Sequence, residues 1–182
     1  MTKQKVKIGL AIASLCIISF YVIYTFLKPQ VNYADLSPYV LLDASDVQLA
    51  VQQSLRENTP QQLEEQIKKI VSIAKKMPLP PADIQFLRSD DAKDYLVFHG
   101  KRALFDELVS EQFKTLGSIS DLKQRFPEAK DKFKQADEML SQRDVLFEQI
   151  VTGFIDQGFT HQQAQAQARA QWYNRFKLDV VK

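Results

Sequence analysis

The sequence FKQADEMLSQRDVLFEQIVTGF covers residues 133–154 and has a regular apolar spacing. The residues of this series stand three or four positions apart: Phe133, Ala136, Leu140, Arg143, Phe147, Ile150 and Phe154. Such spacing is that of a heptad seam, which turns one face of an α-helix towards other helices. We expect a long helix over residues 127–157. A seam of this kind more often packs into the protein core than forms a groove for a binding partner. It contains one charged residue, Arg143.

Residues typical of helix boundaries stand on both sides of this stretch and indicate further helices beyond it. Pro127 suits a first helical position and Gly158 a helix end. Thr160 is a cap for a last helix over residues 161–177, whose first part alternates glutamine and alanine. Before Pro127, a short helix is expected from Ser118 or Ser120 to Phe126.

The preceding part of the chain is also expected to be helical. One helix is expected from Asp90 or Asp91 to about Leu116, with Gly117 as its C-cap. Earlier helices are expected from Asp43 or Ser45 to Glu57, over 60–77, and in a short turn at 82–88. Pro78–Pro81 reads as a stiff hinge between them.

The helix over 60–77 carries its own start and surface signals. Thr59, Pro60 and Gln62 fit an N-cap, a first helical position and a capping box. Glu64 with Lys68 and Glu65 with Lys69 are i,i+4 pairs on its wet side.

Residues 8–27, IGLAIASLCIISFYVIYTFL, contain no charge. As a helix they would be about 30 Å long, the thickness of a hydrocarbon core. Lys3, Lys5 and Lys7 precede them, so the amino terminus is expected inside the cell. We expect a bacterial inner-membrane protein with a cytoplasmic stub (1–7), a transmembrane anchor (8–27), a tether (28–42) and a periplasmic helical domain (43–182).

Three other interpretations of this run stay open. It is long for a cleaved signal peptide and lacks an Ala-x-Ala site before Lys28. Lipoprotein processing at Cys16 would need a small residue before the cysteine, where Leu15 stands. A buried helix of a soluble protein is disfavoured by the unbroken apolar length.

Composition favours one all-α domain after the anchor, of about five to six helices. The net charge is +2, and without the three lysines before the span 21 basic and 22 acidic residues remain, a net of −1. No nucleic-acid footprint is therefore expected. The single cysteine, Cys16, lies in the apolar run, which excludes disulfides and thiolate metal sites beyond it.

Catalytic and metal motifs are missing from the sequence. The two histidines, His99 and His161, have no partners at metal-ligand spacing. The acidic run at 89–94 lacks the calcium-loop pattern and is typical of a helix amino terminus. We expect no cofactor, no metal and no enzyme; the alternative, a cell-envelope enzyme or ligand sensor, would first use His99, Asp94 and Arg102.

One aromatic and basic cluster near the carboxyl end is a candidate partner-binding surface. It consists of Trp172, Tyr173, Phe176, Arg169 and Arg175, residue types that are common in interface hot spots. The competing interpretation is that this helix simply docks on the core.

The layout of an amino-terminal anchor and a helical extracytoplasmic domain resembles membrane-anchored periplasmic chaperones such as the lipase-specific foldases. The resemblance concerns architecture alone and implies no residue roles. We expect a domain that binds a membrane-associated or periplasmic protein by helix-in-groove contact, as an assembly factor, accessory subunit or chaperone. A subunit that acts mainly through its transmembrane helix is a further alternative.

Overall fold

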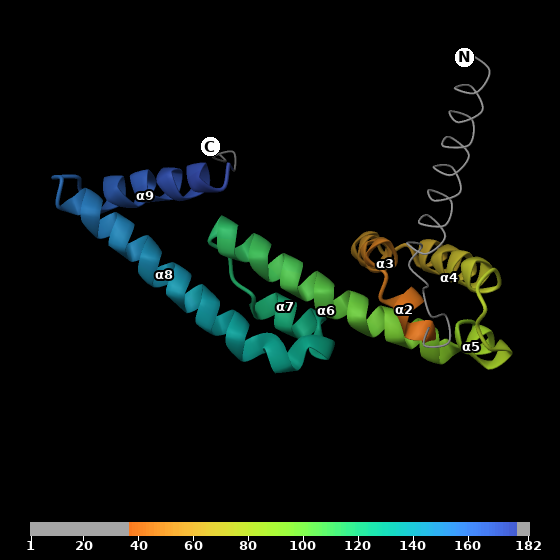
Figure 1. The fold of residues 1–182 in the computed structure, drawn as a ribbon. Helices are drawn as coiled ribbons and strands as arrows, with labels where there is room; N and C mark the ends of the chain where they lie inside the picture. The colour runs from red at the N-terminus through yellow and green to blue at the C-terminus, as the bar shows by residue number, and fades with distance from the viewer. Residues whose placement is uncertain (1–36, 178–182) are drawn as a thin grey trace, which may run out of the picture. The chain divides into compact units, whose positions relative to one another are not determined.

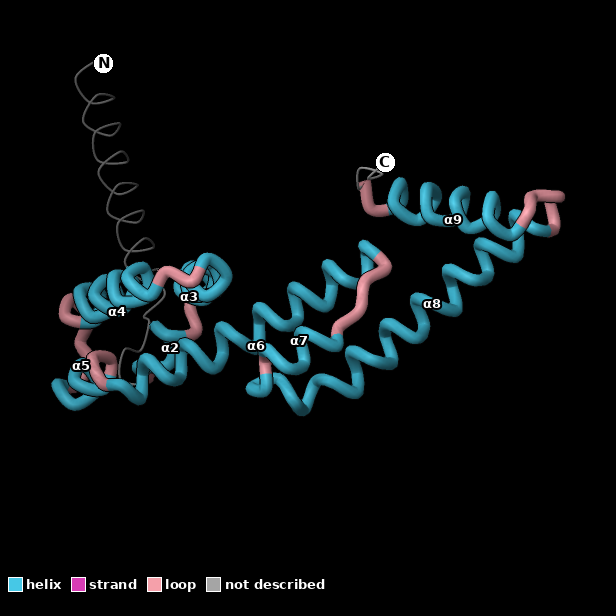
Figure 2. The backbone as a smooth tube through the Cα atoms, turned by 180° about the vertical axis from the view of Figure 1, so that it is seen from behind, coloured by secondary structure: helices cyan, strands magenta, loops and turns pink. Residues whose placement is uncertain are grey.

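The computed structural model describes residues 37–177, in which every regular element is a helix (Figures 1 and 2). The all-α prediction is confirmed for this range. It contains eight α-helices and one 3₁₀ helix, against the five to six expected, because several are only five or six residues long. The elements are α2 (Pro38–Leu42), α3 (Ser45–Glu57), α4 (Pro60–Ala74), α5 (Pro81–Phe86), α6 (Asp90–Thr115), α7 (Ser120–Arg125), η2 (Pro127–Lys132), α8 (Phe133–Ile155) and α9 (His161–Arg175).

The predicted anchor at 8–27 lies outside the described residues. Of the helices between Pro38 and Arg175, none has the length and apolarity that crossing a bilayer requires.

Helix α2 begins inside the segment that the sequence suggested as an irregular tether. Ser37 caps it and Pro38 takes its first position. Leu42 is 1% exposed, and α2 contacts α3, α4 and α5. Residues 38–42 therefore pack as part of the helical domain.

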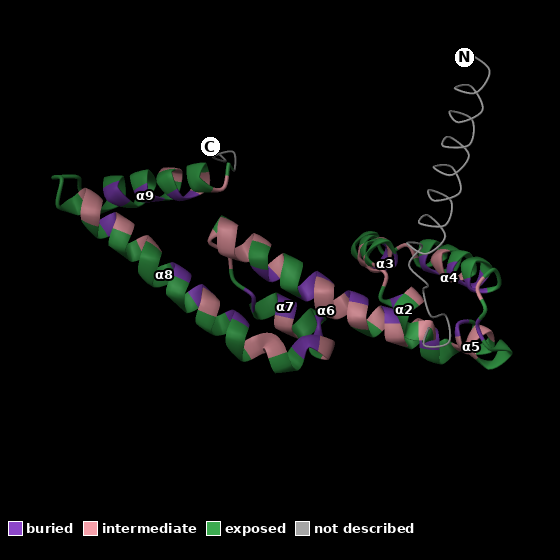
Figure 3. Ribbon diagram, in the orientation of Figure 1, coloured by how far each residue is buried: buried purple, intermediate pink, exposed green. Residues whose placement is uncertain are grey.

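The amino-terminal core is formed by α3, α4 and the first half of α6. Val51, Ile70 and Leu96 are buried there. Gly100 of α6 allows a close approach, since a Cβ at this position would lie 2.6 Å from Val51 Cγ1 and 2.9 Å from Leu55 Cδ1. Figure 3 shows the buried faces of these helices.

The start of α4 differs from the predicted capping box. Pro60 does take the first helical position, but the Thr59 side chain makes no cap hydrogen bond. Ser54 Oγ instead donates to the Thr59 carbonyl at 2.7 Å, and Gln62 reaches back to Glu57. The side chains of Thr59 and Gln62 thus turn back to residues of α3.

The second core joins α6, α7, η2 and the first half of α8. Its buried residues include Leu104, Phe105, Phe126 and Leu140. The long helix predicted over 127–157 was wrong at its start: residues 127–132 form η2, and Ala129 departs from helical geometry with φ −100°. The predicted seam residues of α8 are all buried or half-buried.

Helix α9 folds back along the second half of α8 (Figure 2). Ala164 and Ala168 are fully buried against a cluster that includes Val151. The predicted cap at Thr160 is confirmed, and it forms a capping box with Gln163. Small side chains on α9 therefore allow the two helices to pack closely.

Candidate functional site

The carboxyl end of α6 is a joint that receives side chains from two later helices. Leu116 adopts the left-handed conformation with φ 59°, so the predicted C-cap at Gly117 was wrong by one residue. Gly117 leaves room for the Gln112 side chain, whose Oε1 would lie 1.8 Å from a Cβ at this position and would have to move to accommodate one. The last carbonyls of a helix lack intrahelical donors, which makes this end a site for outside donors.

Arg143, the charge in the predicted seam, supplies two of these donors. Its Nη1 donates to the carbonyls of Gln112 at 2.9 Å and Gly117 at 2.8 Å. Its Nε and Nη2 donate to Asp144 Oδ1. Arg143 is 5% exposed, and the negative end of the α6 dipole adds to its stabilisation.

Trp172 and Tyr173 of α9 bind the same helix end. Trp172 Nε1 donates to the Lys114 carbonyl at 3.0 Å, and Tyr173 Oη donates to the Thr115 carbonyl at 3.2 Å. The indole ring packs against Phe113 and Phe147, with ring centroids 5.6 and 6.4 Å away. This joint therefore holds α9 against α6.

The other members of the predicted partner-binding cluster lie around this joint. Trp172 is 1% exposed, Phe176 packs on it at 5.5 Å, and the Arg175 guanidinium lies 5.9 Å from its ring. Arg169 donates to Tyr173 Oη at 3.4 Å. The indole face is thus used inside the fold, whereas Arg169 and Arg175 are exposed. Partner binding by this cluster stays a prediction.

The three residues of the enzyme or sensor alternative are not brought together as a site. His99 stacks on Tyr95 with centroids 4.2 Å apart, and Asp94 is exposed. The Arg102 guanidinium is bound by Asp131 and by the Glu128 carbonyl. Its hydrogen bond to Asp131 raises the pKa of Arg102 and lowers that of the carboxyl group.

Neighbouring groups also have structural partners. Tyr95 Oη donates to Asp43 at 2.8 Å, and burial together with this hydrogen bond raises the pKa of Tyr95 to about 12. Ser89 caps α6, so the acidic run beginning at Asp90 occupies its first turn, as expected. His161 is exposed at the first position of α9. Within residues 37–177, no group of three potential ligands is placed to hold a metal ion.

A groove lies between α6 and α8, on their surfaces beside the second core. Two adjacent hollows of 350 and 290 Å³ are both lined by Ser110 and Met139, and together they make up this groove. We call it the α6–α8 groove; its lining is Phe105, Asp106, Val109, Ser110, Phe113, Lys132, Gln135, Ala136, Met139, Gln142, Arg143 and Leu146. Residue numbers rise together on the two sides, because both helices run in the same direction (Figure 1).

The groove has an apolar floor and a mainly neutral rim. Met139 is half-buried in the floor, and Leu146 is 45% exposed at one end. An ion pair between Lys132 and Asp106 bridges the other end. The side formed by Lys132 of η2 and by α8 as far as Leu146 is about 20 Å long at the helical rise. These are the dimensions and chemistry that suit a short amphipathic helix.

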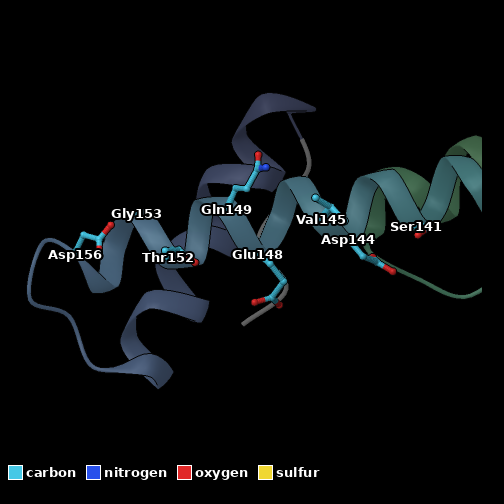
Figure 4. A pocket seen from close by; sticks show the side chains of 8 residues that line it. All are labelled: Ser141, Asp144, Val145, Glu148, Gln149, Thr152, Gly153 and Asp156. Atoms are coloured by element: carbon cyan, nitrogen blue, oxygen red, sulfur yellow. The ribbon is translucent and has the colours of Figure 1, made fainter.

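A third hollow, of 610 Å³, lies on another face of α8 and is lined differently from the groove. Figure 4 shows that its eight lining residues all belong to this one helix and its C-cap residue, at positions 141–156. Three are acidic: Asp144, Glu148 and Asp156. A single helix face cannot enclose a small molecule, so this surface is an open one.

Comparisons of the chain with protein-family models, curated proteins and solved structures found no match. The α6–α8 groove was not located from the sequence. Met139, Gln142 and Leu146 were its signal, since they form a second stripe beside the seam at spacings of three and four. The α6 side had no signal of its own, because only the fold brings it opposite α8.

Proposed function

We propose that this chain is a membrane-anchored accessory protein whose helical domain binds another protein in the α6–α8 groove. The observation that carries the proposal is the pair of adjacent hollows with an apolar floor between two helices. Residues 8–27 would hold the domain at the membrane, and the domain would act as an assembly factor, accessory subunit or chaperone. Anchoring would raise the local concentration of the domain near a membrane-associated partner.

The lining of the groove defines the partner segment. Val109, Met139 and Leu146 favour an aliphatic stripe, and methionine adapts to differing side chains. Ser110, Gln135 and Gln142 favour neutral polar residues beside that stripe. The partner is therefore expected to present an amphipathic helix with anchors at i, i+3 or i+4, and i+7.

The test is an affinity capture from gently solubilised membranes with the full-length chain and a Leu146→Lys variant. Leu146 is half-exposed, so the variant is expected to fold and to place a charge in the groove. Leu49→Lys is the matched control, because Leu49 is 64% exposed on α3, away from the groove. Loss of one stoichiometric partner with Leu146→Lys but not with Leu49→Lys supports the proposal.

Capture of the same partner by both variants contradicts binding in the groove. Thermal unfolding by circular dichroism checks that both variants are folded. Topology is tested separately with Gln165→Cys in a Cys16→Ser background, since Gln165 is exposed. Labelling by an impermeant maleimide outside the inner membrane is expected, and labelling only after lysis would contradict the periplasmic location.

A further inference from the structure

A hollow of 420 Å³ beside α4 gathers three cations and a hydroxyl group. Its lining comes from α4 with its C-cap residue and from one residue shortly after the end of α5: Ile67, Lys68, Val71, Ser72, Lys75 and Arg88. Lys68, Ser72 and Lys75 follow one another at i, i+4 and i+7, and so lie on one face of α4. Arg88 adds a third cation from outside that helix.

The three cations of this hollow differ from several other lysines of residues 37–177 in having no ion-pair partner within that range. Lys93, Lys101 and Lys132 each bind a carboxylate of another element. No carboxylate among residues 37–177 forms an ion pair with Lys68, Lys75 or Arg88.

Glu64, the predicted ion-pair partner of Lys68, binds a different lysine. Glu64 accepts from Lys93 of α6, and this hydrogen bond lowers the pKa of the Glu64 carboxyl group. The helix pair between Glu64 and Lys68 that the sequence suggested is therefore replaced by a contact between helices. The result is a positive hollow with a donor hydroxyl at Ser72.

Charge and donor chemistry identify the class of ligand. Lysine ammonium groups, an arginine fork and a serine hydroxyl are donors that match the oxygens of a phosphate group. Ile67 and Val71 supply an apolar wall beside these donors. A phosphate that carries an apolar tail fits this combination.

We propose that this hollow binds the phosphate group of an anionic phospholipid in the membrane that holds the anchor. The inference rests on the anchoring part of the proposed function. Residues 28–37 span at most about 35 Å between the apolar run and α2. Because α2 packs against α4, the helix with the hollow is held near the point where the chain enters the domain.

The experiment uses the full-length protein in vesicles of phosphatidylcholine, with and without added phosphatidylglycerol. Hydrogen–deuterium exchange of the amides in 67–76 reports contact with the bilayer. The site variant is Lys68→Gln with Lys75→Gln, and the matched control is Lys130→Gln with Lys134→Gln, two exposed lysines on η2 and α8. Detergent-solubilised protein with inorganic phosphate is the arm without a lipid headgroup.

We expect the amides in 67–76 to exchange more slowly in vesicles that contain phosphatidylglycerol than in vesicles of phosphatidylcholine alone. This slowing should disappear in the site variant and persist in the control variant. Each lysine is expected to strengthen the contact about fivefold. Equal exchange in both kinds of vesicle would overturn the proposal, and equal slowing by inorganic phosphate alone would overturn the lipid as its source. Co-flotation with phosphatidylcholine vesicles tests the anchor independently, so its failure is distinguishable from failure of the headgroup site.

Discussion

Arg143 and Arg88 carry the same charge in two regions of the molecule and have opposite surroundings. Arg143 is buried at the carboxyl end of α6, where two carbonyls and Asp144 accept its hydrogen bonds. Arg88 is exposed beside the α4 hollow and has no ion-pair partner in the range 37–177. A charge that the fold satisfies internally is expected to stabilise it, whereas an exposed and unpartnered charge is available for binding.

The largest expected effect is at the joint of α6 and α9. Trp172→Ala removes a fully buried ring and its hydrogen bond to Lys114, and should lower the free energy of unfolding by about 3–5 kcal/mol. Urea unfolding followed by circular dichroism measures this loss. A loss below about 1 kcal/mol would show that α9 is not held through this ring.

The next effect is at Arg143. Arg143→Met keeps the packing length but leaves the carbonyls of Gln112 and Gly117 without this donor, at a cost of about 2–3 kcal/mol. Trp172 is the single tryptophan, so its fluorescence reports on the joint. A shift of emission to the red is expected, and unchanged emission with unchanged stability would contradict a role of Arg143 at this helix end.

How far the sequence predicts these two regions depends on whether a signal is local. The helical seam at 133–154, the cap at Thr160 and the helix amino terminus at Asp90 follow from spacing and from side chains within a few residues, although the predicted helix start at Pro127 was wrong. The role of Arg143 does not, because its acceptors lie 26 and 31 positions earlier in the chain. Only its unusual place in an apolar seam marks it.

The same limit explains why the sequence suggested a different ion pair at α4 and why it did not locate the α6–α8 groove. Spacing pairs Glu64 with Lys68, but tertiary packing brings Lys93 to Glu64, and Lys68 forms no ion pair with a residue of the described range 37–177. The groove needs α6 and α8 side by side, which no local pattern specifies. Trp172 illustrates the reverse case, since its residue type suits both a partner surface and a buried joint.

A third, smaller effect concerns the ion pairs between α6 and η2. Their cations, Lys101 and Arg102, are half-buried, between the buried Arg143 and the exposed Arg88. Hydrogen bonding to Arg102 lowers the pKa of Asp131. Burial raises the pKa of Glu128, but the hydrogen bond from Lys101 and a backbone hydrogen bond outweigh it and lower the pKa.

Both carboxyl groups favour the folded state when ionised. Their contribution is complete above their ordinary pKa values of 3.8 and 4.5 and is lost as the pH falls through the lower folded values. Urea midpoints measured between about pH 7 and pH 3 should fall, and Asp131→Asn should reduce that fall. An identical pH dependence in Asp131→Asn would contradict the assignment.

The smallest expected effect on stability belongs to the α4 hollow. Changing Lys68 and Lys75 together to glutamine should alter the free energy of unfolding by no more than about 0.5 kcal/mol in detergent, because both side chains are exposed and neither forms an ion pair with residues 37–177. Urea unfolding next to Lys130→Gln with Lys134→Gln measures this. A loss close to that of Arg143→Met would mean that the fold itself uses these lysines, and the contrast between the two regions would fail. Unchanged stability with lost protection in phosphatidylglycerol vesicles would instead separate binding from folding at this surface.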